Sequence, residues 1–230
     1  MQIKRLQDRH LADIIALHHL VLAGIPAGFA ARESDDFFAG HLDQSGRIFG
    51  IYAEGTLMVY GVLGLPRPGD ANFGNDHHLP TELLPKVAHI DGVAVHPAWR
   101  GQGWQRKMIA FRLAQAPQFG RDIALSTAAP ANRPSVISLL SCGLSIRGIV
   151  EKFGGTRYLM RRDLVTGVNN DTAISADAMT SSQWLIMDDL QQQQQALAQG
   201  RIGYAFAQTD GIDMIAYGRA TMDHYGRVSK

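Results

Sequence analysis

The chain of 230 residues contains one cysteine, Cys142. A single thiol cannot form a disulfide within the chain, and this favours a reducing compartment such as the cytoplasm. The 22 Lys and Arg residues nearly balance the 21 Asp and Glu residues, so no broad basic surface for nucleic acid is expected. No run approaches the roughly 18 apolar residues of a membrane helix, and the charged residues 1–6 lack the apolar segment of a signal peptide. These absences predict a soluble cytoplasmic protein with neither a nucleic-acid nor a membrane partner.

The sequence also offers little for a metal ion. His18 with His19 and His77 with His78 are adjacent pairs, and neither has a Cys nearby or the i,i+4 spacing of helical metal ligands. They are interpreted as solvated or packed side chains, and no metal site is predicted.

The most informative stretch is residues 93–106. An apolar run stops at Pro97, a turn with two glycines follows, and a helical pattern then begins. The start of a helix presents unpaired N–H groups and a favourable dipole to an anion, and glycines let the backbone approach it closely. The turn lacks the Lys-Ser or Lys-Thr of a P-loop and the third Gly of a Rossmann turn. The stretch therefore predicts a phosphate or pyrophosphate site at the turn and helix start, directly after the strand residues Val93, Ala94 and Val95. The residues of this site are Arg100, Gly101, Gln102, Gly103, Trp104, Gln105 and Arg106.

A second motif follows at Asn132, Ser135 and Gly143, spaced around an apolar helical pattern. With the Arg-x-x-Gly turn at residues 100–103, the order strand, glycine turn, helix, strand, Asn, helix, Gly resembles the GNAT superfamily of N-acetyltransferases over roughly residues 1–164. Two positions depart from the family pattern. Gln105 stands where the family has Gly or Ala, and Leu144 stands where it has Phe.

The resemblance implies an α/β (α+β) fold in which helices flank a mixed, mostly antiparallel sheet. Residues 47–53 and 56–65 are expected to pair as a hairpin within this domain, and residues 87–95 to form its central strand. Polar residues 165–175 are interpreted as a linker. Residues 176–230 are interpreted as a small extension, with a helix from Ser181 or Ser182 to Gly200 and then a hairpin. It should dock on the main sheet or on a partner subunit, which leaves a homodimer open.

The resemblance further implies acetyl-CoA as cosubstrate. The backbone of Val93 and Val95 would bond the pantetheine arm, and the amides of residues 101–106 would hold the pyrophosphate. Trp104 would either cover the cofactor or pack against the sheet. Asn132 would either bond the cofactor or cap the following helix.

For catalysis, we expect Asp91 or His89 to act as the general base, because in an unbroken strand they share one face with Val93 and Val95. The alternative is that the two side chains only orient each other. The family often has a Tyr as general acid where this chain has Leu139. Tyr158 is a substitute, unless the thiolate leaves without an acid. Acidic residues near Glu33 would suit a cationic amine, or else form a solvated helix face.

Two functions follow from these expectations. The first is an acetyl-CoA-dependent N-acetyltransferase that acts on a small amine, a peptide N-terminus or a Lys. The second is a non-catalytic acyl-CoA-binding module with a regulatory or assembly role, which Leu139 and Gln105 would favour.

Overall fold

The computed structural model describes residues 2–164 and 182–219. The chain forms two compact units, Met1–Ser126 and Thr127–Lys230. Within the described residues, no helix is long and apolar enough to cross a membrane. The linker predicted at residues 165–175 and the helix start predicted at Ser181 lie outside the described residues.

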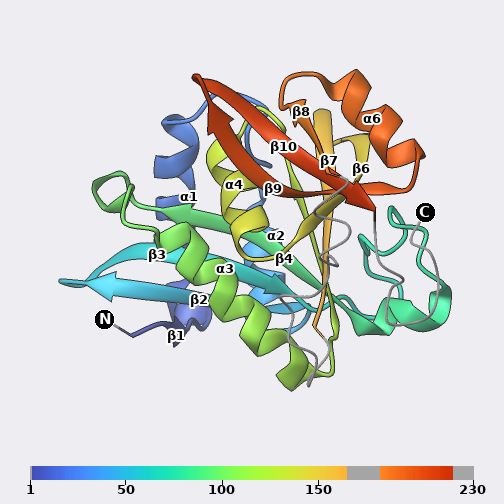
Figure 1. The fold of residues 1–230 in the computed structure, drawn as a ribbon. Helices are drawn as coiled ribbons and strands as arrows, with labels where there is room; N and C mark the ends of the chain where they lie inside the picture. Colours follow the sequence, from blue (N-terminus) through green and yellow to red (C-terminus); the bar gives the residue numbers. More distant parts are fainter. Residues whose placement is uncertain (1, 165–181, 220–230) are drawn as a thin grey trace. The chain divides into compact units, whose positions relative to one another are not determined.

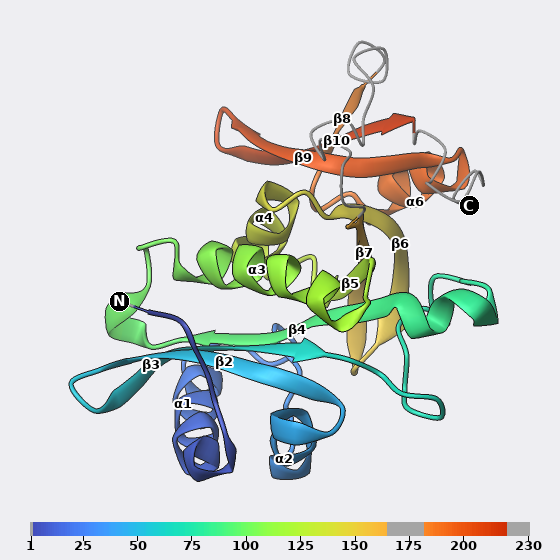
Figure 2. The ribbon, with the colours of Figure 1, turned by 90° about the horizontal axis from the view of Figure 1, so that it is seen from below.

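The first unit is built on strands in the order β1-β2-β3-β4-β5, which pair antiparallel except for the parallel pair β4 and β5 (Figure 1). Helices α1 and α2 cover one face of this sheet, and α3 covers the other (Figure 2). The strands are β1 (Lys4–Arg5), β2 (Gly46–Ala53), β3 (Thr56–Gly64), β4 (Val87–Val95) and β5 (Ile123–Ala128). The helices are α1 (Leu11–Ala23), α2 (Asp35–Asp43) and α3 (Trp104–Gln115), with short 3-10 turns at Asp8–His10, Thr81–Lys86, Pro97–Trp99 and Ala116–Phe119.

The hairpin predicted from the sequence is confirmed. Glu54 and Gly55 connect β2 to β3 with φ angles of 50° and 77°. Two left-handed residues in a row are typical of the tight turns whose twist matches that of a hairpin. The predicted central strand at residues 87–95 is also confirmed, as β4.

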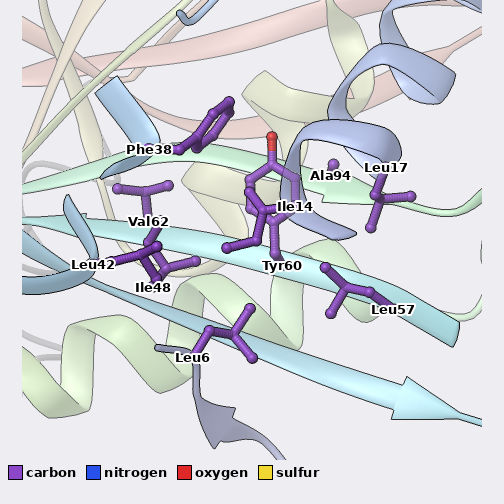
Figure 3. Packing of buried hydrophobic residues seen from close by; sticks show 10 residues of the cluster. All are labelled: Leu6, Ile14, Leu17, Phe38, Leu42, Ile48, Leu57, Tyr60, Val62 and Ala94. Carbon is purple, nitrogen blue, oxygen red and sulfur yellow. The ribbon is translucent and has the colours of Figure 1, made fainter. Parts of the chain in front are cut away.

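The core of this unit lies between the sheet and helices α1 and α2 (Figure 3). Tyr60 of β3 is 1% exposed and lies among these apolar side chains, with its hydroxyl at the end away from Leu6 (Figure 3). The buried members of the cluster are Leu6, Ile14, Leu17, Phe38, Leu42, Ile48, Leu57, Tyr60, Val62 and Ala94. A phenol in such surroundings needs a hydrogen-bond partner, which is described below.

Strand β4 is not the unbroken strand that the sequence suggested. Gly61 of β3 is opposite Val93, but Leu63 is opposite Ile90, so Asp91 and Gly92 both face a single residue of β3. This is a β-bulge, and its extra residue shifts the side-chain alternation by one. Asp91 therefore shares the α1 and α2 side of the sheet with His89 and Ala94, while Val93 and Val95 point to the α3 side.

The second unit contains antiparallel pairs in the order β7-β6-β9-β10-β8. Helices α4 and α6 both pack against β9. The elements are α4 (Arg133–Ser141), β6 (Ser145–Lys152), β7 (Gly155–Asp163), β8 (Gln183–Ile186), α6 (Leu190–Ala198), β9 (Arg201–Thr209) and β10 (Ile212–Arg219).

Residues 182–219 of the expected extension belong to the second unit, and one predicted element there differs. The hairpin of the extension forms as β9 and β10, but the long helix expected from Ser182 is shorter. Residues Gln183–Ile186 instead form strand β8, which pairs with β10. The helix begins at Leu190 because Asp189 caps it, its side chain accepting a hydrogen bond from the Gln192 amide at 2.9 Å.

One residue of the glutamine run at positions 191–195 is buried. Gln193 of α6 is 0% exposed, and its Oε1 accepts hydrogen bonds from the hydroxyls of Tyr158 (2.7 Å) and Tyr217 (2.9 Å). Its Nε2 donates to the carbonyl groups of Ile186 (3.0 Å) and Met187 (2.8 Å). All the bonding capacity of one side-chain amide is therefore used inside the second unit.

Candidate active site

The glycine turn before α3 has the geometry that an anion site needs. Gly101 and Gly103 adopt left-handed φ angles of 76° and 73°, and Gly103 is the N-cap of the helix. A Cβ on Gly101 would meet no atom within 4 Å, so the backbone angle, and not a lack of space, favours glycine there. The Lys107 amide donates to the Gly103 carbonyl at 3.0 Å, which closes the first helical turn. The N–H groups before Lys107 thus belong to the end of the helix that favours anions.

Aromatic and basic side chains surround this turn. The rings of Trp99 and Trp104 stack with centroids 5.4 Å apart, and the Lys107 ammonium lies 4.3 Å from the centre of the Trp104 ring. Trp104 also donates from Nε1 to Oε1 of Gln102 at 3.4 Å. Trp104 therefore packs on the turn itself. Gln105 is half-buried.

Strands β4 and β5 pair over only part of their length. Their register ends at the pair His89 and Leu125, although β4 continues to Val95. Just beyond that pair, the Ser126 hydroxyl donates to the Ile90 carbonyl at 2.7 Å, so a side chain replaces the backbone ladder. Beyond His89, the backbone edge of β4 is therefore not paired with β5.

The unpaired edge belongs to the residues that the sequence singled out. The His96 amide donates to the Met58 carbonyl at 2.8 Å, so the backbone groups of His96 point toward β3. Because these directions alternate along a strand, Val93 and Val95 point their N–H and C=O groups away from β3, toward the β5 side. An extended ligand could add to this edge as a strand would.

Asp91 lies on the bulge and is half-buried. Its Oδ1 accepts from the Gly92 amide at 3.1 Å, and burial raises the pKa of its carboxyl, with His41 and Arg112 opposing the rise. A carboxyl with a raised pKa is better able to take up a proton near neutral pH.

Arg112, which the sequence did not point to, supports the bulge. It is 0% exposed, and its Nη1 donates to the carbonyl groups of Val62 (2.6 Å) and Asp91 (2.7 Å) on either side of the bulge. Its Nε donates to the Met108 carbonyl at 3.2 Å. The guanidinium therefore satisfies carbonyl groups where the strand ladder is interrupted. The only sequence cue is an Arg on the apolar face of a helix, four residues after Met108.

His89 has a different environment from Asp91. Its Nε2 accepts from the Phe73 amide at 3.1 Å, its ring stacks on Phe73 with centroids 4.0 Å apart, and the side chain is 5% exposed. These contacts attach β4 to the loop that contains Phe73. The structure thus shows a structural role for His89, and its role as a base stays a prediction.

Two further titratable side chains, Tyr60 and Glu33, are within electrostatic range of Asp91, and a third, His18, bonds to Tyr60. The Tyr60 hydroxyl and Nδ1 of His18 in α1 share a hydrogen bond of 2.8 Å. Burial raises the pKa of Tyr60, and the charges of Glu33 and Asp91 raise it further, while Arg112 opposes them. Burial and then the charge of Asp91 raise the pKa of Glu33 to about 7. Glu33, in the loop between α1 and α2, therefore belongs to the same electrostatic cluster as Asp91.

The remaining predicted residues lie in the second unit. Asn132 is the N-cap of α4, where its Oδ1 accepts from the Ser135 amide at 3.4 Å. Leu139 is buried. The hydroxyl of Tyr158 is held by Gln193, and burial raises the pKa of that hydroxyl. The cosubstrate contact of Asn132 and the acid role of Tyr158 stay predictions. In the described parts of the chain, no three His, Cys, Asp or Glu side chains gather as a metal site would require.

Comparisons with known proteins agree with this geometry. The yncA protein of Salmonella typhimurium, whose structure holds its cofactor acetyl-CoA, is similar with a TM-score of 0.56 and 19% identity, over 73% of this chain and 96% of that one. The ribosomal-protein-S18-alanine N-acetyltransferase of Escherichia coli is similar with a TM-score of 0.53 and 14% identity, over 74% and 97% of the two chains. At identities this low, the similarity shows a shared fold and does not by itself show a shared activity.

A comparison with curated protein sequences found no match. The family model described as the acetyltransferase (GNAT) family matches residues 14–143, which is more than half of the chain. The mixed sheet, the flanking helices and the glycine turn before α3 are those expected from the sequence motifs. The chain belongs to the GNAT acetyltransferase family.

Proposed function

We propose that the protein is an N-acetyltransferase that moves the acetyl group of acetyl-CoA directly to an amine. The observation that carries this proposal is the separation of β4 from β5 after His89, next to the glycine turn at the start of α3. Together they offer a free strand edge for an extended arm and a helix end for phosphates. The solved structure of yncA with its cofactor acetyl-CoA supports the choice of cosubstrate.

In this proposal, the backbone of Val93 and Val95 bonds the pantetheine arm, and the amides of residues 101–106 bond the pyrophosphate. Lys107 and Arg100 add positive charge near the turn. Hydrogen bonds to a charged phosphate contribute roughly 1.5–3 kcal/mol each, so a few of them suffice for micromolar binding.

The acceptor amine arrives as an ammonium ion and gives one proton to the carboxylate of Asp91. Its nitrogen then attacks the thioester carbonyl, and the C–S bond breaks as the C–N bond forms. The second proton of the nitrogen passes to the CoA thiolate, giving CoA thiol and the amide. A thiol with a pKa of about 8.5 is a good leaving group, so this route needs no side-chain acid.

The variant Asp91→Asn tests the proposal. It should bind acetyl-CoA as tightly as the native protein, measured by calorimetry, and lose at least ~100-fold in CoA release with an amine panel. The matched control is Asp36→Asn, the same chemical change on an exposed residue of α2, which should leave both quantities unchanged.

Two results would contradict the proposal. Full activity of Asp91→Asn would remove Asp91 as the base. Tight acetyl-CoA binding without turnover of any amine would instead favour the non-catalytic acyl-CoA module, which is the function favoured by the buried Leu139 at the family's Tyr position. The cytoplasmic location and a homodimeric state remain predictions from the sequence.

A further inference from the structure

A cluster of four polar side chains lies on the face of the sheet covered by α1 and α2. His18 comes from α1, Glu33 from the following loop, Tyr60 from β3 and Asp91 from the bulge in β4. The His18 and Tyr60 side chains are joined by a 2.8 Å hydrogen bond. The charges of Glu33 and Asp91 both raise the pKa of Tyr60, and Asp91 lies on the same side of the sheet as Tyr60.

In the part of the chain that the structure describes, the two carboxyl groups of the cluster have no bonded cation, although the charges of His41 and Arg112 act on Asp91. Among the described residues, neither Glu33 nor Asp91 is in an ion pair within 4.0 Å. The Nη1 of Arg112 donates to the backbone carbonyl groups of Val62 and Asp91. His18 does not compensate, because burial and then the charge of His19 lower its pKa, against a weaker opposing effect of Asp35. Half-buried carboxylates without a bonded cation are costly, and a cationic ligand would relieve that cost.

A second observation points to a ligand in the same place. His18 is 6% exposed and uses Nδ1 for Tyr60, but its Nε2 is buried and has no hydrogen-bond partner among the described residues. Buried polar atoms are nearly always paired, and leaving one unpaired costs about 1–3 kcal/mol. The neutral ring next to Tyr60 therefore has one polar atom to offer to a bound molecule.

We propose that Glu33, Asp91, Tyr60 and His18 form the acceptor subsite, and that it selects a primary ammonium with no carboxylate near the amine. This inference rests on the proposed acetyltransferase function. Glu33 binds the cation and sets specificity, while Asp91 takes its proton. A free α-amino acid would bring its own carboxylate against Glu33 and Asp91, and like charges in a half-buried site repel strongly. Alkylamines and Lys side chains meet the requirement.

The experiment compares amines that differ only by a carboxylate. Phenethylamine and phenylalanine form one pair, and tyramine and tyrosine form the other. Acetylation by the full chain is followed by CoA release, and amine binding is measured separately by calorimetry in the presence of CoA. We expect at least ~10-fold higher kcat/KM for the amine of each pair.

The variant Glu33→Gln should raise the KM for phenethylamine about 10-fold or more, leave the KM for acetyl-CoA unchanged and remove most of the preference over phenylalanine. Glu82→Gln, an identical change in the exposed turn Thr81–Lys86, is the control and should have no effect. His18→Ala should also weaken amine binding, and circular dichroism checks that this variant is folded.

The outcomes separate this inference from the proposed function. Glu33-dependent binding of phenethylamine without acetylation would support the subsite and refute the transferase. Acetylation with equal kcat/KM for phenethylamine and phenylalanine, or with an unchanged KM in Glu33→Gln, would overturn the subsite and leave the transferase intact. Absence of any amine binding would refute the subsite outright.

Discussion

Replacing Gln193 should destabilise the protein more than any other change in its glutamine tract. Its amide accepts two hydrogen bonds from buried tyrosine hydroxyls and donates two to the carbonyl groups of Ile186 and Met187. In Gln193→Ala, these four partner groups lose their bond to the amide, although the Ile186 carbonyl keeps the bond from the Asp189 amide. At about 1 kcal/mol for each bond, the free energy of unfolding should fall by about 4 kcal/mol. For a chain of this size, such a loss lowers Tm by roughly 10 °C.

The assay is urea and thermal denaturation followed by circular dichroism. The control is Gln194→Ala, the neighbouring residue on the exposed side of the same helix, which should change the unfolding free energy by less than about 0.5 kcal/mol. Gln193→Glu separates the two halves of the network, because a carboxylate still accepts from both tyrosines but donates to neither carbonyl. If Gln193→Ala and Gln194→Ala were equally stable, the reasoning that the buried amide holds α6 in place would be refuted.

Four further measurements test the site and its support. In Gly103→Ala, a left-handed angle costs about 1–2 kcal/mol, so the free variant should relax this turn. Acetyl-CoA binding must then restore the angle, and the affinity should fall by about tenfold in calorimetry, whereas unchanged affinity would argue against a role for this turn. Tyr158→Phe should keep its kcat if the thiolate leaves unaided, whereas a loss of ~100-fold in kcat would restore Tyr158 as the acid. Arg112→Met leaves the carbonyl groups of Val62 and Asp91 without their donor and should cost about 2–4 kcal/mol in urea denaturation, with no loss expected if the bulge is stable without it. Folding raises the pKa of Glu33 from 4.5 to about 7. Protonation of Glu33 therefore contributes its full stabilisation of the folded state below pH 4.5, and this contribution is lost as the pH rises through 7. Glu33→Gln should be more stable than the native protein at pH 8 but not at pH 4.5.

The sequence predicted what depends on local backbone chemistry. Gly101 and Gly103 mark the turn because few other residues adopt its angles, and the apolar run of β4 marks a buried strand. The bulge at Asp91 was missed, since an extra residue in one strand shows only against the register of its neighbour.

Residues whose partners are distant in the chain were missed for the same reason. Arg112 bonds Val62, which is 50 positions away, and Gln193 bonds Tyr158, which is 35 positions away. Glu33 looked like one of several solvated acids, because only the folded chain brings it into the electrostatic range of Asp91. Local patterns therefore located the cosubstrate turn better than the acceptor side.

The bulge in β4 also has a consequence for how relatives of this chain should vary. A relative with one residue fewer between Ile90 and Val93 would have a regular ladder, and its strand carbonyl groups would bond to β3 without help. It would then have no use for a buried guanidinium, and an apolar residue such as Leu would fit better at position 112. The length of this strand and the identity of residue 112 are thus expected to change together across the family.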